Sequence, residues 1–146
     1  MRLRIYPPEE RARVMRAEVE ELLRDGWRLI IVTYDPRFAD FLEDLIRDRG
    51  DVTIIRSLSP DLLTSLLMLL TRLRGGEACL LDDVLGAYLR EASSSPRPYD
   101  LQRSLITIMS ILRSFERQTR SLVSVHTVEQ EAPEWFLKLF DVIEVI

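Results

Sequence analysis

The chain has 146 residues, of which 47% are hydrophobic and 30% are charged, a balance typical of one compact domain spanning residues 1–146. No apolar run approaches the roughly 20 residues that cross a bilayer, and residues 1–5 lack the apolar stretch of a signal peptide, so we expect a cytoplasmic protein without a membrane role. The single cysteine, Cys79, excludes an internal disulfide, and with the single histidine, His126, it supplies too few ligands for a Cys/His zinc site. The net charge of −4 gives no general attraction for nucleic acid.

Strand-like and helix-like segments alternate along the chain. Short apolar runs predict strands at residues 2–6, 29–32, 52–55, 78–81, 121–125 and 141–146. Helical spacing of apolar residues predicts helices over residues 9–24, 36–50, 60–74 and 101–117, and a helical turn over 133–139. The polar, proline-containing residues 91–98 are expected to form a loop.

Two proline signals mark helix starts, and one strand indicates the type of sheet. Asp35-Pro36 is typical of an N-cap followed by proline at the first helical position, and Ser59-Pro60 repeats the pattern. Residues 29–32 form a continuous aliphatic run that suits a parallel strand covered on both faces. We therefore expect a three-layer α/β fold in which a mainly parallel sheet of about six strands carries helices on both faces.

Ligands of an open parallel sheet bind beyond the carboxyl ends of its strands. Polar residues follow four of the predicted strands here: Asp35, Ser57, Asp82-Asp83 and His126-Thr127. Asp35, Asp82 and His126 are candidate catalytic residues because carboxylates and imidazole accept protons, and Asp82 and Asp83 are candidate magnesium ligands. Aspartates after strands also cap helices, so purely structural roles for these side chains stay open.

The order of these segments resembles the RecA/KaiC-type ATPase core, including its archaeal recombinase relatives, over nearly the whole chain. Residues 29–36 look like the strand whose end carries a catalytic acidic residue in that family, with Asp35 in its place. Residues 78–85 are similar to the Walker B strand, with Asp82 as its aspartate. Residues 121–127 look like the sensor strand that ends in a polar residue, here His126, and residues 139–146 resemble the strand that follows.

The resemblance fails at the phosphate loop. A phosphate loop needs glycines, which let backbone N–H groups converge on phosphate, and a lysine that meets the β and γ charges. Residues 4–13 take the expected place and contain neither, and the only lysine is Lys138. Two prolines remove N–H donors, while Glu9 and Glu10 bring negative charge to a helix start where the family binds triphosphate. We expect no bound nucleotide or other cofactor.

Three functional hypotheses follow. The leading one is a non-catalytic RecA/KaiC-like protein that acts as an interaction partner or accessory subunit, in a DNA recombination or repair setting of archaeal type. The first alternative is a small metal-dependent α/β hydrolase or nuclease that uses Asp35, Asp82 and Asp83 with His126. The second alternative is a regulatory homodimer without a nucleic-acid role.

Protein contacts are expected at a leucine-rich helix and at a sheet edge. Residues 62–73 are apolar on more than one face, and a chain this short has difficulty covering all of them, so we expect another subunit to cover an exposed strip. The last strand, residues 141–146, offers a second pairing surface if it forms an open edge. Residues 91–100 follow the Walker-B-like strand, where the family binds single-stranded DNA, but contain only Arg97 as a basic residue, so DNA binding has little support.

Overall fold

The computed structural model describes residues 1–56 and 61–146 and contains a sheet of six parallel strands. The strands are β1 (Arg2–Ile5), β2 (Arg28–Thr33), β3 (Val52–Arg56), β4 (Glu77–Asp82), β5 (Leu122–Thr127) and β6 (Val142–Val145). The helices are α1 (Arg11–Arg24), which follows a 3₁₀ turn (Pro8–Glu10), α2 (Pro36–Leu45), α3 (Leu62–Arg72), α4 (Val84–Ser94), α5 (Pro98–Thr119) and α6 (Glu134–Leu137). None of these helices combines the length and the apolar character needed to cross a membrane.

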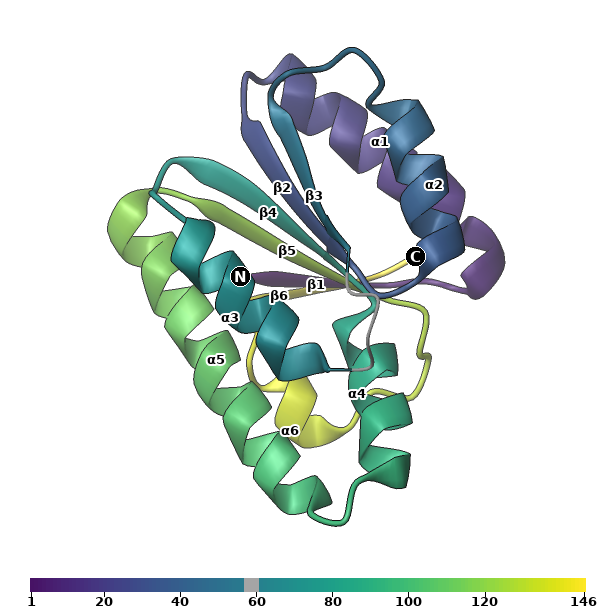
Figure 1. The fold of residues 1–146 in the computed structure, drawn as a ribbon, viewed down its shortest axis with the longest axis vertical. Helices are drawn as coiled ribbons and strands as arrows, with labels where there is room; N and C mark the ends of the chain where they lie inside the picture. Colours follow the sequence, from purple (N-terminus) through teal and green to yellow (C-terminus); the bar gives the residue numbers. More distant parts are fainter. Residues whose placement is uncertain (57–60) are drawn as a thin grey trace.

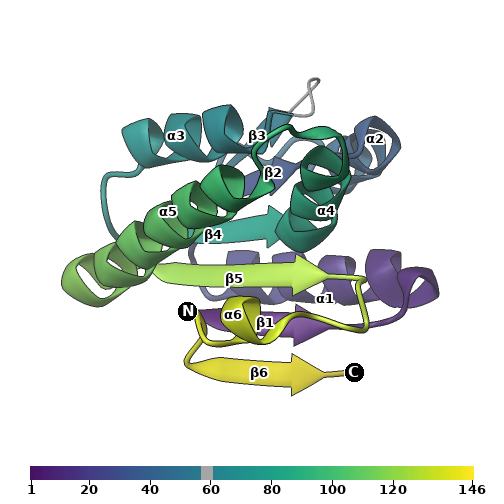
Figure 2. The same cartoon turned by 90° about the horizontal axis from the view of Figure 1, so that it is seen from below.

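Helices cover both faces of the sheet, as the alternation of segments predicts (Figures 1 and 2). The strand order is β3-β2-β4-β5-β1-β6. Helices α1 and α2 lie on one face, and α3, α4, α5 and α6 lie on the other (Figure 1). The predicted three-layer α/β fold with a parallel sheet is therefore confirmed.

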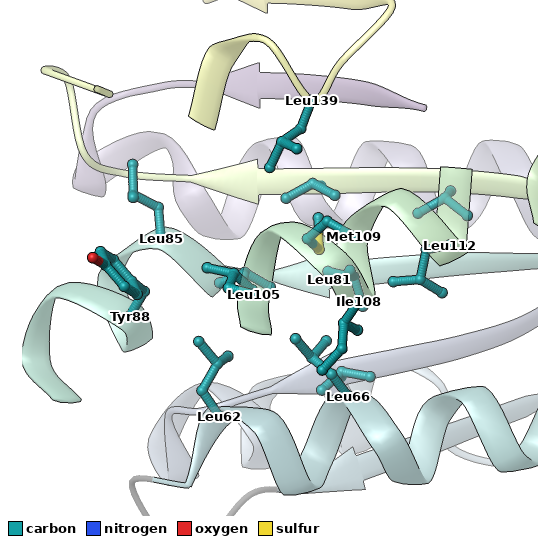
Figure 3. Close-up of a cluster of buried hydrophobic side chains, with 14 of the residues drawn as sticks. Leu62, Leu66, Leu81, Leu85, Tyr88, Leu105, Ile108, Met109, Leu112 and Leu139 are labelled. Atoms are coloured by element: carbon teal, nitrogen blue, oxygen red, sulfur yellow. The ribbon is translucent and has the colours of Figure 1, made fainter. Parts of the chain in front are cut away.

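Two hydrophobic cores separate the layers, and the side chains of a single strand alternate between them. In β2, Ile30 and Val32 pack into the core beneath α3 and α5, whereas Leu29 and Ile31 pack beneath α1 and α2. Figure 3 shows the larger core, where leucines of α3 and α5 meet over β4. The continuous aliphatic run of β2 is thus explained by burial on both faces.

The register of the strands brings their carboxyl ends into one row. Asp82 at the end of β4 lies opposite Thr33 of β2 on one side and His126 of β5 on the other. The helices that follow β2 and β4 leave toward opposite faces of the sheet (Figure 1). Such a divergence opens a crevice at the carboxyl ends, which is the usual ligand position in this architecture.

Two boundary predictions need correction. The expected loop over residues 91–98 is wrong, because α4 continues to Ser94 and α5 begins at Pro98, which occupies the first helical position. The loop position for DNA is thereby reduced to residues 95–97. Ser59 and Pro60 lie outside the described residues, and α3 has its N-cap at Asp61, whose side chain accepts a hydrogen bond from the Thr64 N–H.

Candidate functional site

A pocket of about 270 Å³ opens at the carboxyl ends of β2 and β4. Its lining residues are Arg11, Tyr34, Asp35, Pro36, Asp83 and Arg90. Two of the four predicted candidates, Asp35 and Asp83, therefore line one pocket, and another, Asp82, contacts Arg11 of its wall. The pocket lies at the crevice where the helices diverge.

The central interaction of this site is an ion pair between Arg11 and Asp82. Arg11 is the first residue of α1, and its Nε donates to Oδ1 of Asp82 at 3.1 Å while Nη2 contacts Oδ2. The hydroxyl of Thr33 donates to the same Oδ2 at 2.7 Å. Asp82 is only 1% exposed, so its charge is balanced inside the protein. Two-point binding of this kind is the preferred geometry of arginine with a carboxylate.

The same guanidinium reaches the predicted catalytic position at the end of β2. Nη1 of Arg11 lies 3.0 Å from Oδ2 of Asp35, and the guanidinium carbon lies 4.1 Å from the centre of the Phe38 ring. Asp35 also caps α2, because its Oδ1 accepts the N–H groups of Arg37 and Phe38. Arg11 therefore bridges two strand ends and a helix start.

The pKa values of the two partners follow from this geometry. Burial alone would lower the pKa of Arg11, but the hydrogen bond and charge of Asp82 raise it above its ordinary value. Burial would raise the pKa of Asp35, yet the Phe38 N–H and the charge of Arg11 lower it below its ordinary value. At neutral pH both side chains are charged, so Arg11 works as a fixed internal cation.

Asp83 is held by the backbone rather than free to act as a metal ligand. It adopts a left-handed conformation with φ of 58° and caps α4, where its Oδ1 accepts the Gly86 N–H at 3.3 Å and the Thr127 hydroxyl at 3.2 Å. Its Oδ2 lies 3.8 Å from Nη1 of Arg90, which is mostly exposed. Burial and the neighbouring charge of Asp82 raise the pKa of Asp83. The cap interpretation of Asp83 is thus the one that its contacts favour.

His126 belongs to a separate, fully buried chain of hydrogen bonds. Its Nδ1 lies 2.8 Å from the hydroxyl of Tyr6, and its Nε2 contacts Oε2 of Glu18. Each ring nitrogen therefore has one close polar partner. All three side chains are at most 1% exposed, so none of them faces the pocket. Their arrangement is that of a buried structural network.

The side chains around Glu18 keep its carboxyl group ionised. Burial would raise the pKa of Glu18, but the hydrogen bond with His126 and the positive charge of Arg2 lower it to about 2. Nη2 of Arg2 contacts Oε1 of Glu18, and Nη1 of Arg4 lies 3.5 Å from Oε2 of Glu18. Burial also raises the pKa of Tyr6, so its hydroxyl stays protonated.

Sequence reasoning missed Arg11, Tyr6 and Glu18. Glu18 lies within the apolar stripe of α1, next to Val19 and one turn from Met15, and a lone carboxylate in such a stripe signals a buried partner. Arg11 comes two turns before Glu18 on the same helix, so both project toward the sheet. Ser57, the remaining strand-end candidate, lies outside the described residues.

The donor set of the site does not favour a metal. Both carboxylate oxygens of Asp82 are engaged by Arg11, and Thr33 occupies a further lone pair. Across residues 1–56 and 61–146, no three or more His, Cys, Asp or Glu side chains are grouped to hold an ion. A positive guanidinium at this position also repels a divalent cation.

Comparisons with known proteins do not assign the chain to a family. No protein-family model matches it. No curated protein shows significant sequence similarity to it.

Proposed function

We propose that this chain is a non-catalytic RecA/KaiC-like protein that acts as an accessory subunit or interaction partner, in a DNA recombination or repair setting. The observation that carries the proposal is the ion pair of Arg11 with Asp82. In the RecA/KaiC-type family that the chain resembles, the aspartate at the position of Asp82 holds the magnesium of a bound nucleotide. Here an arginine of the protein itself supplies the positive charge at that carboxylate.

The amino-terminal end of α1 supports the same conclusion. Pro7 precedes a 3₁₀ turn of Pro8, Glu9 and Glu10, and Arg11 follows as the first α-helical residue. Two prolines cannot donate N–H groups, and two carboxylates at the helix start repel phosphate by about 1–4 kcal/mol each at close range. Anion binding at a helix N-terminus needs the opposite composition.

The size of the pocket also argues against a nucleotide. Its volume of about 270 Å³ lies below the roughly 300–1,000 Å³ of ordinary small-molecule sites. Arg11 and Asp35 line it as an ion pair, so neither charge is left unpaired for a ligand. The alternative hydrolase hypothesis requires a metal at Asp82, but the guanidinium of Arg11 binds that carboxylate.

Calorimetric titration with ATP and magnesium tests the loss of nucleotide binding. We expect no heat of binding at nucleotide concentrations up to about 1 mM, with an active ATPase of the same fold class measured alongside as the positive control. Saturable binding to the wild-type protein would reject the proposal.

Two further assays separate the alternatives. Metal-dependent cleavage of DNA, RNA or phosphoesters that is lost in Asp82→Asn would favour the hydrolase, and we expect none. A pull-down from the source lysate tests the accessory role, and we expect a DNA-repair or recombination protein to be retained in stoichiometric amount. Retention of no protein contradicts the accessory role.

A further inference from the structure

A second hollow lies at the amino ends of β2, β3 and β4, at the opposite edge of the sheet from the pocket described above. Its volume is about 530 Å³, within the range of roughly 300–1,000 Å³ that is usual for small-molecule sites. The charged residues that line this amino-edge recess are three arginines, Arg28, Arg72 and Arg74, and two acids, Asp51 and Glu77. Positive charge therefore exceeds negative charge in its lining.

The recess lies on the face of the sheet that carries α3, beside the end of that helix. Side chains alternate along a strand, so Arg28 points to the same face as Ile30, which packs in the core with the leucines of α3. Thr53, the neighbour of Ile30 in β3, is exposed, so the helix layer does not cover this part of the sheet. Arg72 is the last residue of α3, and Arg74 follows it. The recess thus has a polar floor and an arginine border.

The three guanidinium groups have no anionic partner in the protein. Within residues 1–56 and 61–146, none of the three arginines forms an ion pair, although two carboxylates line the same recess. Arg28 and Glu77 are direct neighbours on adjacent strands. The Glu77 carboxylate nevertheless accepts the backbone N–H of Arg74, at 2.8 Å from Oε1. The side chains of the arginines are therefore left to bind another group.

Position at a helix end accounts for only one of these arginines. Arg72 lies in the last turn of α3, where the helix dipole favours a positive charge. Arg28 is the first residue of a strand, and Arg74 lies beyond the helix, so the dipole explains neither of them. Three unpaired cations around one recess repel one another, and an anion bound between them removes that repulsion.

We propose that the amino-edge recess binds a small anion that carries at least two phosphate groups. Guanidinium groups bind phosphate oxygens through paired N–H donors, and they stay charged at every physiological pH. The entrance is open, because a Cβ atom at Gly26 or Gly50 of its rim would meet nothing within 4 Å. Among the described residues no aromatic side chain lines the recess, so a nucleobase has no ring to stack on. The ligand that fits is a diphosphate or bisphosphate without a base.

Calorimetric titration with sodium pyrophosphate, in the absence of magnesium, tests the site. At an ionic strength of about 20 mM we expect saturable binding with a Kd below about 1 mM. Inorganic orthophosphate should bind at least about five-fold more weakly, because a single phosphate group engages fewer of the arginines. Absence of saturable pyrophosphate binding up to about 10 mM contradicts the inference. Equal affinity for the two anions also contradicts it.

Matched variants locate the bound anion. Arg28→Gln and Arg72→Gln should each weaken pyrophosphate binding at least about five-fold. Arg103→Gln is the control, because Arg103 is an exposed arginine of α5 that lies outside the recess and forms no ion pair within the described residues. It removes the same charge and should change the affinity by less than about two-fold. An equal loss in all three variants shows a general charge effect and contradicts the inference.

Asp51→Asn tests the recess with a change of the opposite sign. The Asp51 side chain is exposed, and its backbone carbonyl, which accepts the Leu29 N–H at 2.8 Å, is unaffected by the substitution. Removing this negative charge from the lining should tighten pyrophosphate binding at least about two-fold. Loss of an ordinary structural side chain does not increase affinity for an anion. Unchanged or weaker binding in Asp51→Asn contradicts the recess as the site.

The inference is independent of the accessory role, because the recess and the Asp82 site lie at opposite edges of the sheet. Magnesium in the nucleotide titration coordinates phosphate oxygens, so we expect the recess not to take up that complex. The double variant Arg28→Gln/Arg72→Gln distinguishes the two sites. Nucleotide binding that persists in the double variant belongs to the carboxyl edge and rejects the accessory role alone, whereas pyrophosphate binding that persists there contradicts the recess.

Discussion

Replacing Arg11 by methionine removes the positive charge that balances Asp82. Among the residues that the structure describes, the buried carboxylate then keeps only the Thr33 hydroxyl as a close donor. Breaking a buried ion pair by removing one partner costs about 3–5 kcal/mol. The second contact of Arg11, with the partly exposed Asp35, adds at most about 1 kcal/mol. We therefore expect Arg11→Met to lower the free energy of unfolding by about 4 kcal/mol.

Urea unfolding followed by circular dichroism measures this loss. With a typical urea slope of about 2 kcal/mol per molar, the midpoint should fall by about 2 M. Arg13→Met is the matched control, because Arg13 is 65% exposed and, within residues 1–56 and 61–146, forms an ion pair with Glu10 alone, one helical turn away. We expect that control to change the free energy of unfolding by less than about 0.5 kcal/mol.

A double-mutant cycle separates the lost pair from lost packing. In Arg11→Met combined with Asp82→Asn neither charge remains, and the double variant should recover at least about half of the loss seen in Arg11→Met alone. If Arg11→Met costs under about 1 kcal/mol, or if the two substitutions add without recovery, the internal-cation explanation of the site is refuted.

Three further outcomes are expected. Glu18 has a pKa of about 2 in the folded protein, below the value of about 4.3 in an unfolded chain. The ionised Glu18 therefore stabilises the fold above about pH 4.3, and this contribution is lost as the pH falls toward about 2. Urea midpoints measured from about pH 4.3 down to about pH 2 should decline, and Glu18→Gln should make the decline smaller. Gly86→Ala should destabilise the protein by about 1–3 kcal/mol, because a Cβ atom there would lie 2.1 Å from Oδ2 of Asp83, whereas Gly50→Ala meets nothing within 4 Å and should be neutral in the same thermal melts. Cys79 is fully buried, so a thiol reagent should label it only at the rate of global unfolding, and rapid labelling of the native protein would contradict its position in the core.

Sequence patterns predicted the layers of this fold because the pattern and the burial have the same physical origin. The run at β2 is aliphatic because both of its faces are covered, and Asp35 precedes a proline because it caps α2. The loop at residues 91–98 was predicted wrongly because its serines and charges are polar whether they are helical or not. There α4 continues to Ser94, and α5 starts at Pro98.

The chemistry of the site was only partly predictable. The strand-end rule correctly placed Asp35, Asp82 and Asp83 together, because parallel strands end at one edge. It gave no information on Arg11, whose partner Asp82 is 71 residues away. Charge pairing over such a separation depends on how the start of α1 lies against the end of β4, which a single sequence does not specify.

The position of β1 within the sheet has a consequence for the order of folding. Its neighbours are β5 and β6, whereas β2, the next strand along the chain, is separated from β1 by β5 and β4. Leu3 and Ile5, both buried, therefore gain their partner strands only through contacts between segments far apart in the sequence, and such contacts slow folding. Until β5 and β6 pair with it, β1 carries unpaired backbone groups and exposed apolar side chains, which favour aggregation.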